Sequence, residues 1–124
     1  SIHFNRHNFA KALADLDEVL KFKPDDLLAL GLRSMIYSSC PESTYRNGAK
    51  AFADALKACE LSKYLDEQSL SSLGAAYAEL GKFAEAIKYQ KMAIELDFKK
   101  TYFEKDSIRL KLYEQGKPYR ITKP

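Results

Sequence analysis

Apolar residues recur at intervals of three and four in two stretches of the chain, on either side of Gly81. This spacing, close to 3.6 residues, places the side chains of each stretch on one side of a helix. Asp66 suits the N-cap that begins the first helix, and Gly81 suits the left-handed residue that ends it. The pattern therefore predicts a helical hairpin over residues 67–98. Its positions are Leu70, Leu73, Gly74 and Tyr77, followed by Phe83, Ala86, Ile87, Gln90, Ala93 and Ile94.

Gly74 stands in the middle of the first predicted helix, where a glycine costs about 1 kcal/mol relative to alanine. A close approach of the second helix would offset this cost. Ala86 and Ala93 are seven residues apart, so they share one face of that second helix and leave room for the approach. We therefore expect the two helices to touch at Gly74.

The register of this hairpin resembles the tetratricopeptide repeat (TPR), a helix-turn-helix unit of about 34 residues. Two positions depart from the family pattern, because Leu70 stands where Trp is usual and Phe98 where Pro is usual. The resemblance implies an all-α fold, a right-handed superhelix of antiparallel helical hairpins. The matching positions are Leu70, Leu73, Gly74, Tyr77, Gly81, Phe83, Ala86 and Ala93.

A looser copy of the pattern precedes this hairpin. Residues 1–24 match a partial first repeat, through Phe9, Ala12, Leu16, Val19 and Pro24. Residues 25–63 match a second repeat, with Leu30, Ser34 and Tyr37 in its first helix and a second helix expected at about 47–61. The segment 40–46 lengthens the connection by about five residues, and Pro41 forbids a continuous helix through it. Residues 64–98 form the third repeat.

A further helix is predicted over about 101–115. Thr101 and Glu104 have the spacing of a capping box, and Gly116 and Pro118 stop the helix. We expect residues 99–116 to be a capping helix after about five repeat helices, and residues 117–124 to be a basic tail. A capping helix needs a polar outer face. Lys105, Asp106, Arg109 and Lys111 are expected on it.

Several short segments resemble, more closely, a bacterial TPR subtype that commonly ends larger proteins, some of which carry Ser/Thr kinase domains. They are Cys40-Pro41-Glu42, Tyr-Arg-Asn-Gly at 45–48, Lys-Ala-Cys-Glu-Leu at 57–61, Ala-Ala-Tyr-Ala-Glu-Leu-Gly at 75–81, and Arg-Leu-Lys-Leu-Tyr-Glu-Gln-Gly-Lys-Pro-Tyr-Arg at 109–120. The likeness covers about residues 27–120. It implies a module, and we expect the chain to be a C-terminal fragment of a longer protein.

Charge is distributed unevenly along the chain, whose net charge is +3. Residues 1–98 carry 12 basic and 14 acidic side chains, whereas residues 99–124 carry 8 and 3. The excess in the second part fits either a solvated helix with a basic tail or a docking patch for an acidic partner. No apolar run reaches the 18 or so residues of a membrane span. With two cysteines, the composition favours a cytoplasmic protein without a disulfide framework.

Candidate catalytic and metal-binding residues are few. His3 and His7 share a helix face, but no Cys or carboxylate lies near them in the sequence, so we expect surface histidines. Cys59 is expected in the core and Cys40 in the packing of the hairpin turn. No phosphate-binding loop or nucleophile motif occurs. We therefore expect no enzyme activity, no cofactor and no metal.

The TPR resemblance implies a concave face lined by the first helix of each repeat, on which peptides bind. By position, this face would carry Leu28, Gly31, Met35, Ser38 and Ser39 from the second repeat. The third repeat would add Gln68, Ser71, Ala75, Ala78 and Glu79, with Lys100 at the edge. These mostly small residues leave room for an extended segment or a helix. Two alternatives stay open: the groove is empty, or another helix, such as the C-terminal one, already fills it.

Some TPR domains hold a partner's C-terminal carboxylate with Lys, Asn and Arg. The matching positions here include Leu32, Met35, Gln68 and Ser72, none of which is basic or Asn, so this specialisation is not expected. RNA binding is not expected either, because the face lacks stacking aromatics and clustered arginines.

The function expected from these patterns is a protein–protein interaction module, a scaffold that binds a peptide or partner protein on the concave face. The alternative is self-association, in which the chain caps a larger repeat protein. The incomplete first repeat motivates a homodimer, because the apolar face of its helix is expected to lack a neighbour. That face carries Phe9, Leu13, Leu16 and Leu20. No nucleic acid or membrane partner is expected.

Overall fold

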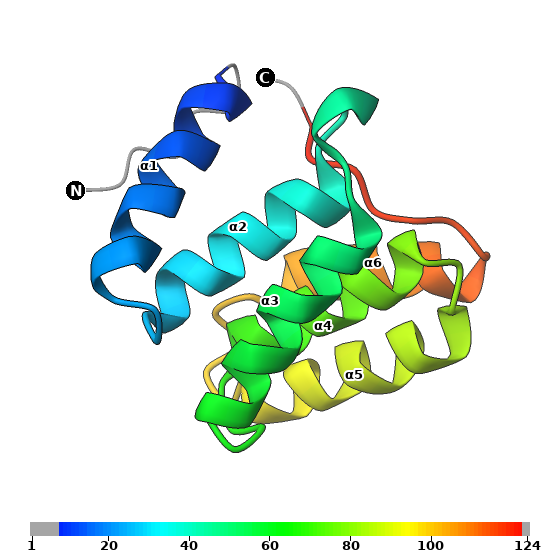
Figure 1. Cartoon of the computed structure of the whole chain (residues 1–124). Coiled ribbons are helices and arrows are strands. Elements are labelled where there is room, and N and C mark those ends of the chain that lie inside the picture. The colour runs from blue at the N-terminus through cyan, green and yellow to red at the C-terminus, as the bar shows by residue number, and fades with distance from the viewer. Residues whose placement is uncertain (1–7, 123–124) are drawn as a thin grey trace.

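The computed structural model describes residues 8–122 of the 124-residue chain, and these residues contain helices and no strand. The helices are α1 (Phe9–Phe22), α2 (Leu27–Ser39), the short 3₁₀ helix η1 (Ser43–Tyr45), α3 (Gly48–Leu61), α4 (Glu67–Glu79), α5 (Phe83–Leu96) and α6 (Phe103–Glu114). Each helix packs on its neighbours in the chain, as Figure 1 shows. The predicted all-α helical-repeat architecture, with five helices followed by a sixth, is confirmed.

Two hairpins, α2–α3 and α4–α5, form the centre of the molecule, and α2 also lies against α4 (Figure 1). Helices α3 and α5 begin 35 residues apart, whereas α2 and α4 begin 40 residues apart. The five extra residues lie between α2 and α3, where η1 forms. The longer connection therefore lies at one end of the α2–α3 hairpin, and α2 still packs against α3 as α4 packs against α5.

The predicted helix ends are mostly confirmed. The side chain of Asp66 accepts a hydrogen bond from the backbone N–H of Ser69 at 3.0 Å, which caps the start of α4. Gly81 and Gly116 have φ of +77° and +71°, in the left-handed region that favours glycine. Each follows the C-cap residue of its helix, so each allows the chain to reverse direction there.

The predicted capping box of the last helix is wrong. Helix α6 begins at Phe103, and its N-cap residue makes no side-chain capping bond. Instead, the carboxylate of Asp97 accepts hydrogen bonds from the backbone N–H groups of Thr101 and Tyr102, at 2.9 and 2.8 Å. These bonds hold the loop before α6, where Tyr102 rather than Thr101 takes the N-cap position.

The apolar face of α1 was expected to lack a neighbour, and the structure corrects this expectation. Phe9, Leu16 and Leu20 are buried, at no more than 9% exposed, in a cluster formed with α2 and with Ile121 of the C-terminal segment. Leu13, the fourth residue of this face, is half-buried against the same cluster, so the chain covers most of the face itself. The homodimer stays a prediction, but the exposed face that motivated it is not present.

Candidate partner-binding groove

A pocket of about 270 Å³ opens between α2, α4 and α6. Five of the residues predicted to line a concave face lie together on it: Leu28, Gly31 and Met35 from α2, and Gln68 and Ser71 from α4. The structure adds Leu32, Glu67, Ser72, Lys105 and Arg109. We call this site the α2–α4–α6 pocket. Two helices that are separated by α3 in the sequence form two of its sides, and α6 forms the third.

The three sides of the pocket differ in chemistry. Helix α2 supplies an apolar side, and Leu28 at its mouth is 56% exposed. Helix α4 supplies short polar side chains. Helix α6 supplies the cations Lys105 and Arg109, whereas the positions on α2 and α4 alone suggested a neutral groove. Gly31 has no side chain and so leaves space in the pocket. A Cβ atom added at Gly31 would have Ser72 Oγ as its nearest neighbour, at 3.7 Å.

A buried polar cluster lies behind the pocket and joins α4, α5 and α6. Arg109 donates a hydrogen bond from Nη1 to the hydroxyl of Ser71 at 2.7 Å. That hydroxyl lies 3.3 Å from both Gln90 Oε1 and Asp106 Oδ1 and can donate to one of them at a time. All four residues are at most 5% exposed. Buried polar groups that bond to one another in this way hold the helices in one relative position.

The first residue of α4, Glu67, faces Asp106 of α6 across this cluster. Burial, followed by the hydrogen bond to Asp106 and the negative charge of Asp106, raises the pKa of Glu67 from its ordinary 4.5 to about 9, against an opposing effect of Lys105. This raised pKa favours the protonated form of Glu67 at neutral pH. A proton on Glu67 removes the repulsion between the two carboxyl groups. Asp106 lies 3.8 Å from Arg109 and offsets one of the two cations of α6, so Lys105 and Arg109 leave the pocket a net positive charge.

The stability of the chain should fall as pH rises from about 5 towards 9. Because the folded state raises the pKa of Glu67, its stabilising contribution is complete below 4.5 and is lost as pH rises through about 9. We expect Glu67→Gln, which keeps a donor at this position, to flatten the decline. Thermal unfolding followed by circular dichroism at pH 5, 7 and 9 would measure this. An unchanged pH profile in the variant would contradict the raised pKa of Glu67.

The other predicted concave-face residues lie elsewhere. Ser38 and Ala78 are buried beneath the C-terminal segment, and Ala75 is also buried. Glu79, at the end of α4, forms ion pairs with arginines. Lys100 lies in the loop before α6, with its ammonium group 5.3 Å from the ring centre of Phe103, and it does not line the pocket. Within the described residues, the α2–α4–α6 pocket is open, whereas the non-helical C-terminal segment covers Ser38 and Ala78.

Lys105, Asp106 and Arg109 were expected on the outer face of α6, and this interpretation is wrong for two of them. Asp106 and Arg109 are 0% and 5% exposed and face α4. A signal was present, because Asp106, Arg109 and Tyr113 are spaced by three and four residues and share one face.

Other candidate chemistry adds little to this site. Cys40 and Cys59 are buried in two different hydrophobic clusters, and burial raises the pKa of Cys59 to about 12, so its thiol stays protonated. His3 and His7 lie outside the described residues. Within residues 8–122, no group of three His, Cys, Asp or Glu side chains could hold a metal ion, and no helix is long and apolar enough to cross a membrane.

Comparison with known proteins identifies one part of the chain. The family model of the tetratricopeptide repeat matches residues 68–96, which comprise nearly all of the α4–α5 hairpin. No curated protein and no solved structure is similar enough to count as a match. TPR domains are typically non-enzymatic modules that mediate protein–protein interaction. The match, together with the helical-repeat architecture of the described residues, supports a TPR-like protein.

Proposed function

We propose that this chain is a protein-interaction module that binds a segment of a partner protein in the α2–α4–α6 pocket. The observation that carries the proposal is the open pocket itself. It gathers residues from α2 and α4, which are the first helices of the two hairpins. Helical-repeat proteins build their concave binding surfaces from such equivalent helices. Its small side chains, above all Gly31, leave space for an inserted side chain or an extended segment.

The chemistry of the pocket indicates which partner segment it suits. Leu28, Leu32 and Met35 offer an apolar surface on one side, and Lys105 and Arg109 offer positive charge on the other. A segment with an apolar side chain next to an acidic one complements both sides. Such charge complementarity contributes to specificity and to the rate of association more than to affinity. Binding should therefore weaken as the salt concentration rises.

Peptide selection tests this proposal directly. A displayed library of random peptides is panned against the chain, and the affinities of enriched peptides are measured by calorimetry. We expect peptides that combine apolar and acidic residues, and a loss of about tenfold or more in affinity for Gly31→Phe, whose ring would fill the pocket. Gly31→Ala is the matched control and should bind as the wild type does. Enriched peptides that bind Gly31→Phe equally well would refute the proposal.

A further inference from the structure

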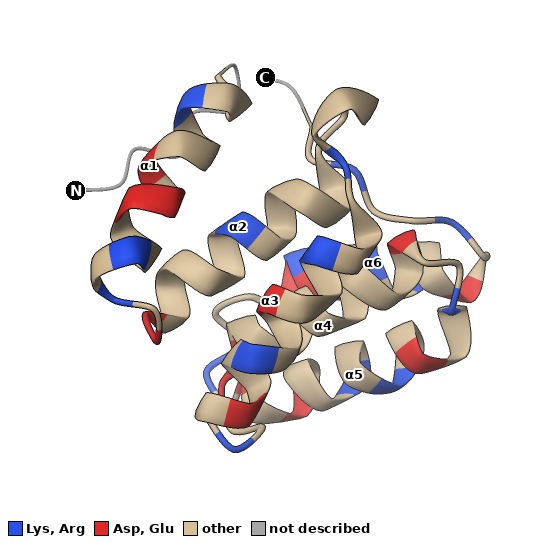
Figure 2. Cartoon of the chain, in the orientation of Figure 1, with Lys and Arg blue, Asp and Glu red and all other residues tan. Residues whose placement is uncertain are grey.

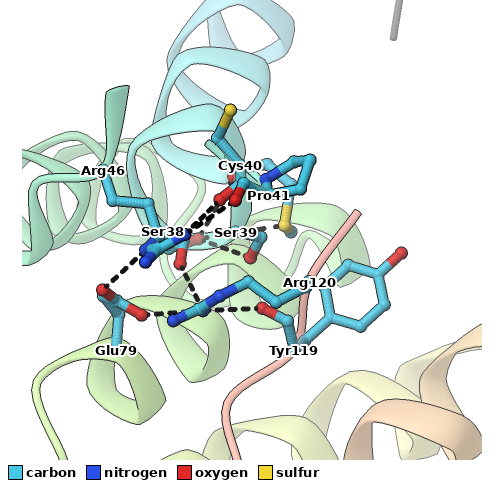
Figure 3. A network of polar contacts seen from close by, with 9 residues as sticks. Ser38, Ser39, Cys40, Pro41, Arg46, Glu79, Tyr119 and Arg120 are labelled. Carbon is cyan, nitrogen blue, oxygen red and sulfur yellow. Dashed lines mark hydrogen bonds and ion pairs between the residues drawn. The ribbon is translucent and has the colours of Figure 1, made fainter. Parts of the chain in front are cut away.

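The C-terminal segment after α6, residues 117–122, crosses the end of the concave face without regular secondary structure and reaches the end of α2 (Figure 1). Figure 3 shows Tyr119 and Arg120 of this segment against the ends of α2 and α4. The segment is held by side chains at three successive positions and by a main-chain hydrogen bond from the N–H of Ile121 to the carbonyl of Ser39 at 2.8 Å. These contacts are of the kind that an extended peptide makes with its binding protein.

The central contact of the segment is an ion pair between an arginine and a carboxylate. Arg120 places Nη1 2.8 Å from Oε1 of Glu79 and also donates to the carbonyl of Ser38 at 3.3 Å. The same carboxylate lies 3.4 Å from Nε of Arg46, whose Nη1 donates to the carbonyl of Cys40 at 2.8 Å (Figure 3). Because Arg46 is fixed by the α2–α3 connection, Glu79 keeps a cationic partner when Arg120 leaves.

The side chains on either side of Arg120 occupy two different environments. The guanidinium of Arg109 lies 4.5 Å from the ring centre of Tyr119, which packs against the cluster of Ala78, Ala86 and Tyr113. On the other side, Ile121 is 7% exposed in the cluster that joins α1 and α2. The surface thus holds an aromatic residue, an arginine and an aliphatic residue, in that order. We call it the tail slot.

The tail slot and the α2–α4–α6 pocket are neighbours on one face. Arg109 lines the pocket and also contacts Tyr119, so a partner segment that extends from the pocket along α4 would reach the tail. The slot is built from small side chains, among them Ser38, Ser39 and Ala78. Basic residues lie along the C-terminal segment (Figure 2), and one of them, Arg120, pairs with Glu79 at the end of α4.

We propose that the tail slot is a recognition site for an extended segment of a partner protein with the pattern aromatic–arginine–aliphatic, and that residues Tyr119–Ile121 occupy it as an internal competitor. The inference deepens the proposed function, on which it rests for the role of this face. A tethered occupant acts at an effective concentration in the millimolar range. The free partner segment therefore binds the wild-type chain weakly until the tail is released.

The test uses the full chain and the fluorescent peptide Lys-Pro-Tyr-Arg-Ile-Thr, which repeats residues 117–122. Arg120→Glu places a like charge against Glu79 and should release the tail. By fluorescence polarisation, we expect the peptide to bind this variant about tenfold or more tightly than the wild type. Lys117→Glu, the same charge change at an exposed residue of the same segment, should behave as the wild type does. The peptide with Glu in place of Arg should bind none of them.

A second measurement does not depend on the folding of the variant. Hydrogen exchange at the Ile121 amide of the wild type should accelerate at saturating peptide, because the peptide then takes its place at Ser39. A folded Arg120→Glu variant that binds no more tightly, or peptide binding that ignores the peptide's arginine, would overturn the proposal. So would a wild-type dimer that the peptide dissociates, since this would assign the slot to tail exchange between copies. Peptide binding to Arg120→Glu should survive Gly31→Phe, so the slot and the pocket can fail separately.

Discussion

Replacing Tyr113 with alanine should lower the free energy of unfolding by about 3–5 kcal/mol, the usual cost of removing a buried aromatic side chain. Tyr113 is fully buried, and it packs from α6 into a cluster with Ala78 of α4 and Ala86 of α5. Ala78 and Ala86 are too small to fill the cavity that loss of the ring would leave, so the packed interior would lose contacts there. Urea unfolding followed by circular dichroism would measure the change.

Tyr113→Phe is the matched control for this experiment. The hydroxyl of Tyr113 makes no hydrogen bond with the residues that the structure describes, so the phenylalanine variant should unfold close to the wild type. Because Tyr113 anchors α6, the alanine variant should also bind peptides in the α2–α4–α6 pocket more weakly, through displacement of Lys105 and Arg109. A loss of less than 1 kcal/mol would show that α6 is not part of the cooperative core.

Replacing Gly74 with valine should destabilise the chain by about 3 kcal/mol, at the upper end of the range for overpacking. A Cβ atom at Gly74 would lie 3.2 Å from the backbone carbonyl oxygen of Ala86 and 3.5 Å from the backbone nitrogen of Gln90. These are main-chain atoms of α5, so the backbone of α5 would have to shift by a few tenths of an ångström for the Cβ atom alone, and further for the two methyl groups of valine. Thermal unfolding of the variant would measure the effect, with helix content checked at low temperature.

Gly31→Val offers the control, because Gly31 also lies within a first helix of a hairpin but meets only Ser72 Oγ at 3.7 Å. That variant should change stability by less than about 1 kcal/mol, since the added side chain points into the open pocket and improves helix propensity. Equal destabilisation by both substitutions would mean that glycine is needed for some reason other than the contact between α4 and α5.

The position equivalent to Gly74 in the α2–α3 hairpin shows how the same register accepts another residue. Ser34 stands there, fully buried, and donates a hydrogen bond to the carbonyl of Ala51 in α3 at 2.8 Å. Ala51 in turn corresponds to Ala86 of α5. In the α2–α3 hairpin, the hydroxyl of Ser34 donates to the facing carbonyl of Ala51. In the α4–α5 hairpin, the backbones approach so closely that a Cβ at Gly74 would lie 3.2 Å from the facing carbonyl oxygen. The register of small residues was readable from the sequence, but the separation of the helices was not.

The sequence by itself determined the helices and the contact between them. The 3.6-residue period, with Asp66 and Gly81 at the ends of α4, placed that helix because these signals are local and act within a few residues. The close approach at Gly74 was also predictable, because an unfavourable glycine inside a helix requires a compensating contact. Five residues of the pocket followed from the repeat register.

Only the tertiary structure decided how α6 and the C-terminal segment pack against α2 and α4. The rotation of α6 about its axis buries Asp106 and Arg109, and it depends on contacts between residues about 35 positions apart. The path of the tail brings Arg120 to Glu79, about 41 positions away in the sequence. The pKa of Glu67 is raised only because Glu67 meets Asp106 in a buried site. The spacing of Asp106, Arg109 and Tyr113 showed that they share a face, but it did not show which residues that face would meet, since each contact needs a particular partner at a particular distance. The open pocket and the filled slot therefore became visible only when the helices were packed.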